Sequence, residues 1–179
     1  MKTKDVEKIL ITEAELAKRT KELGKKISED YAGKKILALG ILKGSVVFLS
    51  DLIRNIEPEV SIDFMTVSSY GNSSQSSGEL KIKKDLDTDI SGKDVLIVED
   101  IIDSGVTLSK LKEVLLKRNP ASLKICTLLN KPERRTVSVD VDYIGFDIPN
   151  EFIIGYGLDY AEKYRDLPFV GVLKREIYE

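Results

Sequence analysis

The chain has 179 residues, of which 42% are hydrophobic and 32% are charged, and its formal net charge is −2 at pH 7. This length and balance indicate one globular domain, residues 1–179, with room for a sizeable core. The slight acidic excess argues against a nucleic-acid partner, because binding to many phosphates needs a clearly basic surface.

Hydrophobic periodicity predicts alternating helices and strands. Residues 12–31 form the first predicted helix, because apolar side chains recur on one of its faces. Strands are expected at 36–42, 60–68, 95–100 and 123–129, and further helices at 45–56 and after Gly105. This alternation predicts an α/β fold with a parallel central sheet flanked by helices. After Pro149 the pattern becomes short and irregular, which predicts a small C-terminal hood over residues 149–179 together with the N-terminal segment, and a last strand at 169–173.

The chain contains no histidine and one cysteine, Cys126. Catalysis by Ser-His-Asp or Cys-His groups is thereby excluded, and any metal has to be a hard cation on oxygen ligands, such as Mg²⁺ held largely by substrate phosphates. Cys126 lies in an apolar run and is expected in the core. Neither a membrane-spanning apolar run nor a signal-peptide pattern is found, so a cytoplasmic protein without membrane contact is expected.

The most informative stretch runs from Val95 to Leu108. Four apolar residues predict a buried strand that leads into a helix, and ligands of open α/β sheets bind at such carboxyl ends of strands. The adjacent acids Glu99 and Asp100 suit the two hydroxyls of a ribose, and the small polar turn that follows suits a phosphate at a helix N-terminus. On residue types alone, an equal alternative is that Asp103 and Ser104 cap the helix while the two acids complement its dipole.

As a complete string, this stretch resembles the phosphoribosyl diphosphate (PRPP) signature of the type I phosphoribosyltransferases. Its Glu-Asp-Ile-Ile-Asp-Ser-Gly sequence is similar to that of the hypoxanthine-guanine branch. The resemblance implies the type I phosphoribosyltransferase fold, with Glu99 and Asp100 holding the ribose hydroxyls and a magnesium ion. It makes Asp103 the catalytic residue beside N7 of the base. The 5′-phosphate is then expected on Asp103, Ser104, Gly105, Val106 and Thr107.

Lys43 and Gly44 lie between a predicted strand and the next helix. A glycine at such a carboxyl-end loop lets a phosphate approach the backbone, although a surface lysine is the simpler interpretation without further context. The resemblance implies a pyrophosphate-binding loop here, often with a cis peptide bond before the lysine.

Residues 68–79 are rich in serine, glycine and asparagine. Such composition usually marks a linker, but in a single-domain chain a mobile lid is the better interpretation, because sugar transfer requires exclusion of water. The resemblance implies that Ser69 and Tyr70 close over the reaction centre.

Two further segments extend the resemblance toward the base. Lys131 follows a predicted strand and is expected to donate a hydrogen bond to the 6-oxo group of a purine. Phe152 and Ile153, otherwise typical core residues, match the base-binding segment, in which the aromatic ring stacks on the purine. The resemblance also implies that Asp159 is a base-side residue and a ligand, direct or through water, of a second magnesium ion, and that Arg165 contacts the pyrophosphate.

The resemblance as a whole implies a purine-salvage transferase. It joins hypoxanthine or guanine to PRPP, gives IMP or GMP plus pyrophosphate, uses Mg²⁺, and assembles as a homodimer or homotetramer. Two alternatives remain: a phosphoribosyltransferase for xanthine or a pyrimidine, and a PRPP-sensing regulator on the same fold that binds nucleic acid. A base-exchange assay beside a nucleic-acid shift assay separates these hypotheses.

Overall fold

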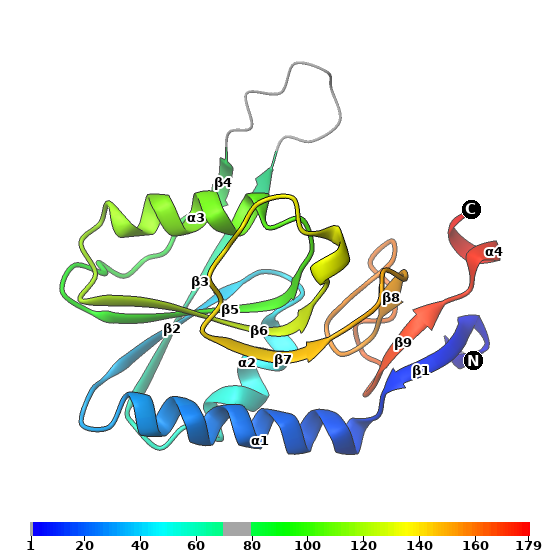
Figure 1. The fold of residues 1–179 in the computed structure, drawn as a ribbon, viewed down its shortest axis with the longest axis horizontal. Coiled ribbons are helices and arrows are strands. Elements are labelled where there is room, and N and C mark those ends of the chain that lie inside the picture. The colour runs from blue at the N-terminus through cyan, green and yellow to red at the C-terminus, as the bar shows by residue number, and fades with distance from the viewer. Residues whose placement is uncertain (1, 70–79) are drawn as a thin grey trace.

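The structure is a computed structural model that describes residues 2–69 and 80–179 (Figure 1). Its centre is a six-stranded sheet in the order β4-β3-β2-β5-β6-β7. All neighbouring strands are parallel except β4, which pairs antiparallel with β3 at one edge. The predicted α/β fold with a parallel central sheet is confirmed, and β4 adds an antiparallel edge. The bounds are β2 (Ile36–Ile41), β3 (Val60–Ser69), β4 (Leu80–Lys84), β5 (Asp94–Ile102), β6 (Ser122–Asn130) and β7 (Tyr143–Asp147).

Helices cover both faces of this sheet. In Figure 1, α1 (Glu13–Asp30) and α2 (Val46–Ile53) lie on one side, and α3 (Val106–Leu116) lies on the other. Alternate residues of β5 face opposite layers, since Leu96 and Val98 pack with α1 and α2, whereas Val95 and Ile97 pack with α3. A strand buried on both faces has to be apolar throughout, which explains the continuous hydrophobic run in the sequence.

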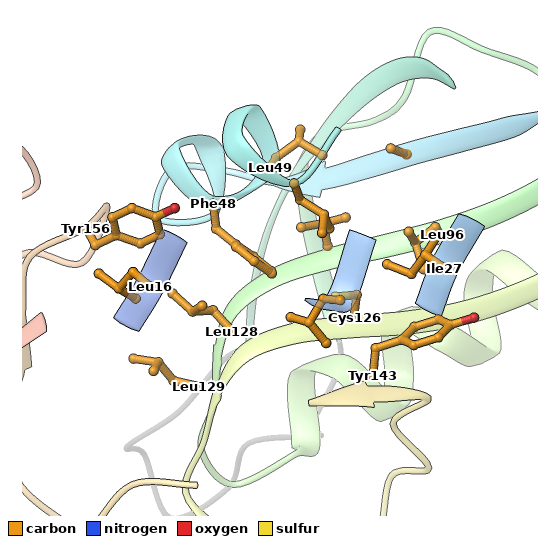
Figure 2. Close-up of a cluster of buried hydrophobic side chains, with 14 of the residues drawn as sticks. Leu16, Ile27, Phe48, Leu49, Leu96, Cys126, Leu128, Leu129, Tyr143 and Tyr156 are labelled. Atoms are coloured by element: carbon orange, nitrogen blue, oxygen red, sulfur yellow. The ribbon is translucent and has the colours of Figure 1, made fainter. Parts of the chain in front are cut away.

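The larger core lies between the sheet and the α1–α2 layer (Figure 2). Leu16 and Ile27 of α1 and Phe48 of α2 point toward the strands there, and all three are buried. Cys126 of β6 is also fully buried in this cluster, as its apolar surroundings in the sequence predict.

The hood contains a second sheet. Strands β1 (Val6–Ile11), β9 (Val170–Leu173) and β8 (Ile153–Ile154) pair antiparallel in the order β1-β9-β8, so both ends of the chain meet there (Figure 1). Short helical segments η1 (Lys2–Asp5) and α4 (Arg175–Tyr178) flank this sheet, and η2 (Pro132–Arg134) follows β6. Among the helices that the structure describes, none has the length and hydrophobicity to cross a membrane.

Helix α1 begins with a capping box. Glu15 N donates to Thr12 Oγ1 at 3.3 Å, and Thr12 N donates to Glu15 Oε2 at 2.8 Å. This reciprocal pair satisfies two N–H groups that a helix start otherwise leaves open. The predicted helix over 12–31 therefore matches α1 plus one residue at each end.

We expect Thr12→Ala to lower the free energy of unfolding by about 1 kcal/mol, because the side-chain acceptor at the N-cap is lost. Chemical denaturation measures the effect. Thr12→Ser keeps the hydroxyl oxygen and is expected to stay near wild type. Equal stability of the Ala and Ser variants contradicts the capping role.

Candidate active site

The junction between β5 and α3 forms a small polar cavity with a volume of about 140 Å³. The N-cap of helix α3 is Gly105, whose φ of 84° lies in the left-handed region that favours glycine. A β-carbon there would come within 2.6 Å of the Val137 carbonyl oxygen, so the packing also requires glycine. The free N–H groups at the start of α3 open onto this cavity, which suits a phosphate. Of the predicted phosphate loop, Asp103, Ser104, Gly105 and Thr107 line the cavity, and Val106 is the first residue of α3.

Asp103 does not cap α3. Its carboxylate accepts a hydrogen bond from Arg134 Nε at 3.0 Å, and its main-chain carbonyl accepts one from Arg135 Nε at 3.1 Å. The N-cap of the helix is Gly105, without a side-chain hydrogen bond. The alternative role of Asp103 as a helix cap therefore has no support in the structure, whereas Ser104 Oγ accepts a hydrogen bond at 3.4 Å from N of Val106, the first residue of α3.

Glu99 and Asp100 form a half-buried acidic pair near the end of β5. Burial, only partly offset by the hydrogen bond from Ile101 N to Asp100 Oδ1 at 2.9 Å, raises the pKa of Asp100 to about 6. Burial, followed by the charge of Asp100, raises the pKa of Glu99 well above its usual value. Because desolvation disfavours the charged form of both acids, a cation or hydrogen-bond donors such as sugar hydroxyls would stabilise their carboxylates.

The Lys43–Gly44 loop is packed against this acidic pair. The peptide bond between Leu42 and Lys43 is cis. A β-carbon at position 44 would lie 1.6 Å from Asp100 Oδ2, and one at Gly157 would lie 2.1 Å from the Gly44 carbonyl oxygen. The loop after β2, the end of β5 and the hood therefore meet where only glycine backbones fit.

Two cations approach the same edge of the site. Lys43 Nζ lies 3.1 Å from Glu162 Oε2, and Arg165 Nη2 lies 3.5 Å from that same oxygen. Arg165 also contacts Asp159 Oδ1 at 2.8 Å and donates to the Gly157 carbonyl at 2.8 Å. Lys43 and Arg165, both predicted to hold pyrophosphate, thus share Glu162, and Gly44 lies beside Gly157, whose carbonyl accepts from Arg165.

A larger cavity of about 530 Å³ lies between the central sheet and the hood. The predicted base-side residues Lys131, Phe152, Ile153 and Asp159 all line it. Lys131 is only 9% exposed and donates from Nζ to the Glu151 carbonyl oxygen at 2.7 Å. Burial lowers the pKa of the Lys131 ammonium. An ammonium group that only donates hydrogen bonds is suited to recognise a carbonyl acceptor.

Asp103 lines both cavities. It stands where the phosphate cavity at the start of α3 meets the larger cavity that contains Lys131. A ligand with a phosphate in one cavity and a flat ring in the other passes this carboxylate.

Sequence reasoning missed several residues of the larger cavity. Arg134 in η2 pairs with Asp103, and Glu7, Arg175 and Tyr178 come from the two chain ends. The basic Arg134-Arg135 pair after Lys131 was a local signal for the first contact. The chain-end residues carried no local signal, because only the pairing of β1 with β9 brings them to the cavity.

Comparisons with known proteins agree with this geometry. A family model described as a phosphoribosyl transferase domain matches residues 6–161. The hypoxanthine-guanine phosphoribosyltransferase of Streptococcus agalactiae serotype V is 55% identical over 97% of both chains, and that of Bacillus subtilis strain 168 is 54% identical over 98% of this chain and 97% of its own. The crystal structure of a hypoxanthine phosphoribosyltransferase from Staphylococcus aureus is 49% identical, covers 99% of this chain and 97% of its own, and has a TM-score of 0.96.

The chain belongs to the hypoxanthine-guanine branch of the phosphoribosyltransferase family. The resemblance inferred from the PRPP signature and the type I phosphoribosyltransferase fold are confirmed. Its relatives act on small-molecule substrates, and enzymes of this family use a metal ion in catalysis.

The residues of this phosphoribosyltransferase fit a hard divalent cation only in part. Glu99 and Asp100 offer the oxygen donors that such an ion prefers. Within residues 2–69 and 80–179, no group of three or more acidic, cysteine or histidine side chains is arranged to hold a metal. Both carboxylate oxygens of Asp159 are engaged, one with Arg165 and the other with Glu162 N at 2.8 Å. The protein therefore supplies an incomplete set of ligands, which suits an ion that shares its coordination with substrate oxygens.

Most of the predicted lid, residues 68–79, lies outside the described residues. Tyr70 lies outside the described residues, and Ser69 is described only through its backbone, as the last residue of β3. Their role stays a prediction.

We expect Asp100→Asn to stabilise the ligand-free protein. Folding raises the pKa of Asp100 from 3.8 to about 6, so the folded state favours the protonated carboxyl. The protonated carboxyl therefore stabilises the fold at low pH, and this stabilisation is lost as the pH rises from 4 to 6. At pH 7.5 and without divalent metal, the variant is expected to gain on the order of 2 to 3 kcal/mol in the free energy of unfolding. Below pH 4, where both states are protonated, the difference is expected to vanish.

Asp103→Asn is the matched control. It is not expected to stabilise the protein at pH 7.5, because the Asp103 carboxylate is ion-paired with Arg134. Urea denaturation at pH 3.5 and 7.5 measures both variants. A destabilised Asp100→Asn protein at pH 7.5 would contradict the cost assigned to the buried charge.

Proposed function

We propose that this phosphoribosyltransferase joins N9 of hypoxanthine or guanine to C1′ of PRPP, with release of pyrophosphate and formation of IMP or GMP. The observation that carries the proposal is the position of Asp103 between the phosphate cavity and the cavity of Lys131. That arrangement suits a nucleoside monophosphate, whose phosphate and base are joined through a ribose. The sequence identity to hypoxanthine-guanine phosphoribosyltransferases supports the choice of base.

PRPP is held at three places in this proposal. Its 5′-phosphate accepts hydrogen bonds from the loop Asp103 to Thr107 and the start of α3. Its ribose hydroxyls donate to Glu99 and Asp100. Its pyrophosphate lies on the Lys43–Gly44 loop and Arg165, where glycine permits close approach and the guanidinium forms paired hydrogen bonds with phosphate oxygens.

The base lies in the larger cavity. Lys131 donates to the 6-oxo group, the ring of Phe152 stacks on the purine beside Ile153, and the Asp103 carboxylate takes or orients the N7 proton. The bond to the leaving pyrophosphate breaks as the bond from N9 to C1′ forms. Most of the rate then comes from positioning and charge stabilisation.

Mg²⁺ is the proposed metal, with Glu99 and Asp100 as the protein-side residues of one ion and Asp159 as that of a second. When bound, it neutralises charge on the leaving pyrophosphate. Asp159 has to exchange its contact with Arg165 to take part, and that exchange frees the guanidinium for the pyrophosphate.

The setting of the enzyme follows the family resemblance. We propose that residues 1–179 form a single domain whose hood completes the base cavity, that Ser69 and Tyr70 close over the reaction centre, and that the protein acts in the cytoplasm as a homodimer or homotetramer.

A screen of free bases with PRPP and magnesium tests the function. Rapid nucleotide formation is expected with hypoxanthine and guanine, and none with adenine or uracil. The rate with xanthine shows whether this third 6-oxopurine is also a substrate. Activity is expected to disappear on complete removal of divalent metal and to return with Mg²⁺. Efficient use of adenine, or full turnover without metal, contradicts the proposal. Binding of nucleic acid in a gel-shift assay, without turnover of any base, supports the alternative of a PRPP-sensing regulator.

Lys131→Gln tests recognition of the 6-position. An ammonium only donates, whereas an amide both donates and accepts, so kcat/KM for hypoxanthine is expected to fall roughly ten- to a hundredfold and the gap to adenine to narrow. The exposed Lys117, at the far end of α3, provides the control Lys117→Gln. If Lys131→Gln changes hypoxanthine use no more than the control does, Lys131 does not recognise the base.

A further inference from the structure

The C-terminal helix α4 places an aromatic ring on Phe152. The ring of Tyr178 stacks on that of Phe152 with 4.7 Å between centroids and an interplanar angle of 23°. Tyr160 meets the Phe152 ring at 86° with 5.5 Å between centroids. Phe152 still keeps 37% of its surface exposed. Both Phe152 and Tyr178 line the larger cavity, so the two rings form one aromatic wall of it.

The position of Tyr178 is set by the hood. Lys174 N donates to the Asp5 carbonyl oxygen at 2.9 Å, which ties the start of α4 to the N-terminal segment. Ile177 and Tyr178 pack against the buried hood residues Ile154, Tyr164, Leu167 and Leu173. In Figure 1, α4 follows β9 at the outer end of the hood. The last turn of the chain is therefore a packed element beside the base cavity.

An exposed phenylalanine samples several ring orientations, and a stacking interaction with a flat ligand needs one of them. Ordering a side chain on binding weakens affinity, and a side chain ordered in advance avoids that loss. Near-parallel stacking on Tyr178, with the edge contact to Tyr160, restricts the plane of Phe152 before any ligand enters.

We infer that Tyr178 is a positioning residue for the purine: it fixes the ring of Phe152 in the orientation that receives the base. The inference rests on the proposed function. It concerns binding of the base alone, because Tyr178 lines the larger cavity and does not line the phosphate cavity.

Steady-state kinetics of four variants test the inference. Tyr178→Ala is expected to raise KM for hypoxanthine about three- to tenfold, as the loss of one aromatic pair predicts, while kcat and KM for PRPP stay within about twofold of wild type. Tyr178→Leu keeps apolar packing without a ring and is expected to show the same rise, whereas Tyr178→Phe keeps the ring and is expected to show none. Glu176→Ala, which changes an exposed residue of the same helix that does not line the cavity, is the matched control and is expected to leave KM for hypoxanthine unchanged.

Thermal unfolding of each variant accompanies the kinetics. If Tyr178→Ala does not fold, Tyr178→Leu decides the outcome. An unchanged or lowered KM for hypoxanthine in folded Tyr178→Ala or Tyr178→Leu overturns the inference, as does an equal rise in Glu176→Ala. Failure of the proposed function is distinguishable from failure of this inference, because in the first case the wild-type protein shows no turnover of hypoxanthine with PRPP.

Discussion

The close contact between the Asp100 carboxylate and the backbone of Gly44 is the constraint on which the site depends. No β-carbon fits at position 44, because it would overlap Asp100 Oδ2, and none fits at Gly157, because it would overlap the Gly44 carbonyl. Three segments distant in sequence are thereby held in register: the loop after β2, the carboxyl end of β5 and the hood. Their contact brings the acidic pair, the Lys43 loop and Arg165 within one small region. Two glycines thus determine where the charged groups of this phosphoribosyltransferase stand.

Cations around the site already have carboxylate partners in the protein. Lys43 lies against Glu162, Arg165 against Asp159, and Arg134 against Asp103. A phosphate that binds to Lys43 or Arg165 replaces a carboxylate oxygen with a phosphate oxygen, so the cation never loses an anionic partner. Such an exchange limits the net gain in electrostatic energy, and it frees the carboxylates for other contacts. Binding of an anionic substrate and rearrangement of Asp159 and Glu162 are therefore coupled by the same two cations.

Local patterns in the sequence predicted the elements that carry their own signal. The strand predicted over 36–42 is β2, which is buried on both faces and therefore apolar throughout. Helix α1 was predicted because apolar side chains recur on the face that it buries. Strand β1 was not predicted, because only Ile11 is buried in it and its partner β9 lies at the other end of the chain. The ion pair of Arg134 with Asp103 and the stack of Tyr178 on Phe152 depend on such distant pairings. The family resemblance named Phe152 and Lys131, whereas only the fold shows that Lys131 is buried and that Phe152 has an aromatic neighbour.

The pairing of β1 with β9 also has a consequence for the order in which the molecule assembles. The phosphate cavity is built from residues close together in the chain, at the end of β5 and the start of α3. The base cavity needs Glu7 of β1, Ile153 of β8 and Val172 of β9, which meet only when the first strand pairs with the last. Contacts between residues so far apart in sequence form late, because closing a long loop costs entropy before any contact compensates for it. During synthesis β1 emerges before β9 and stays without its partner until β9 has followed, so the base cavity is completed after the phosphate cavity.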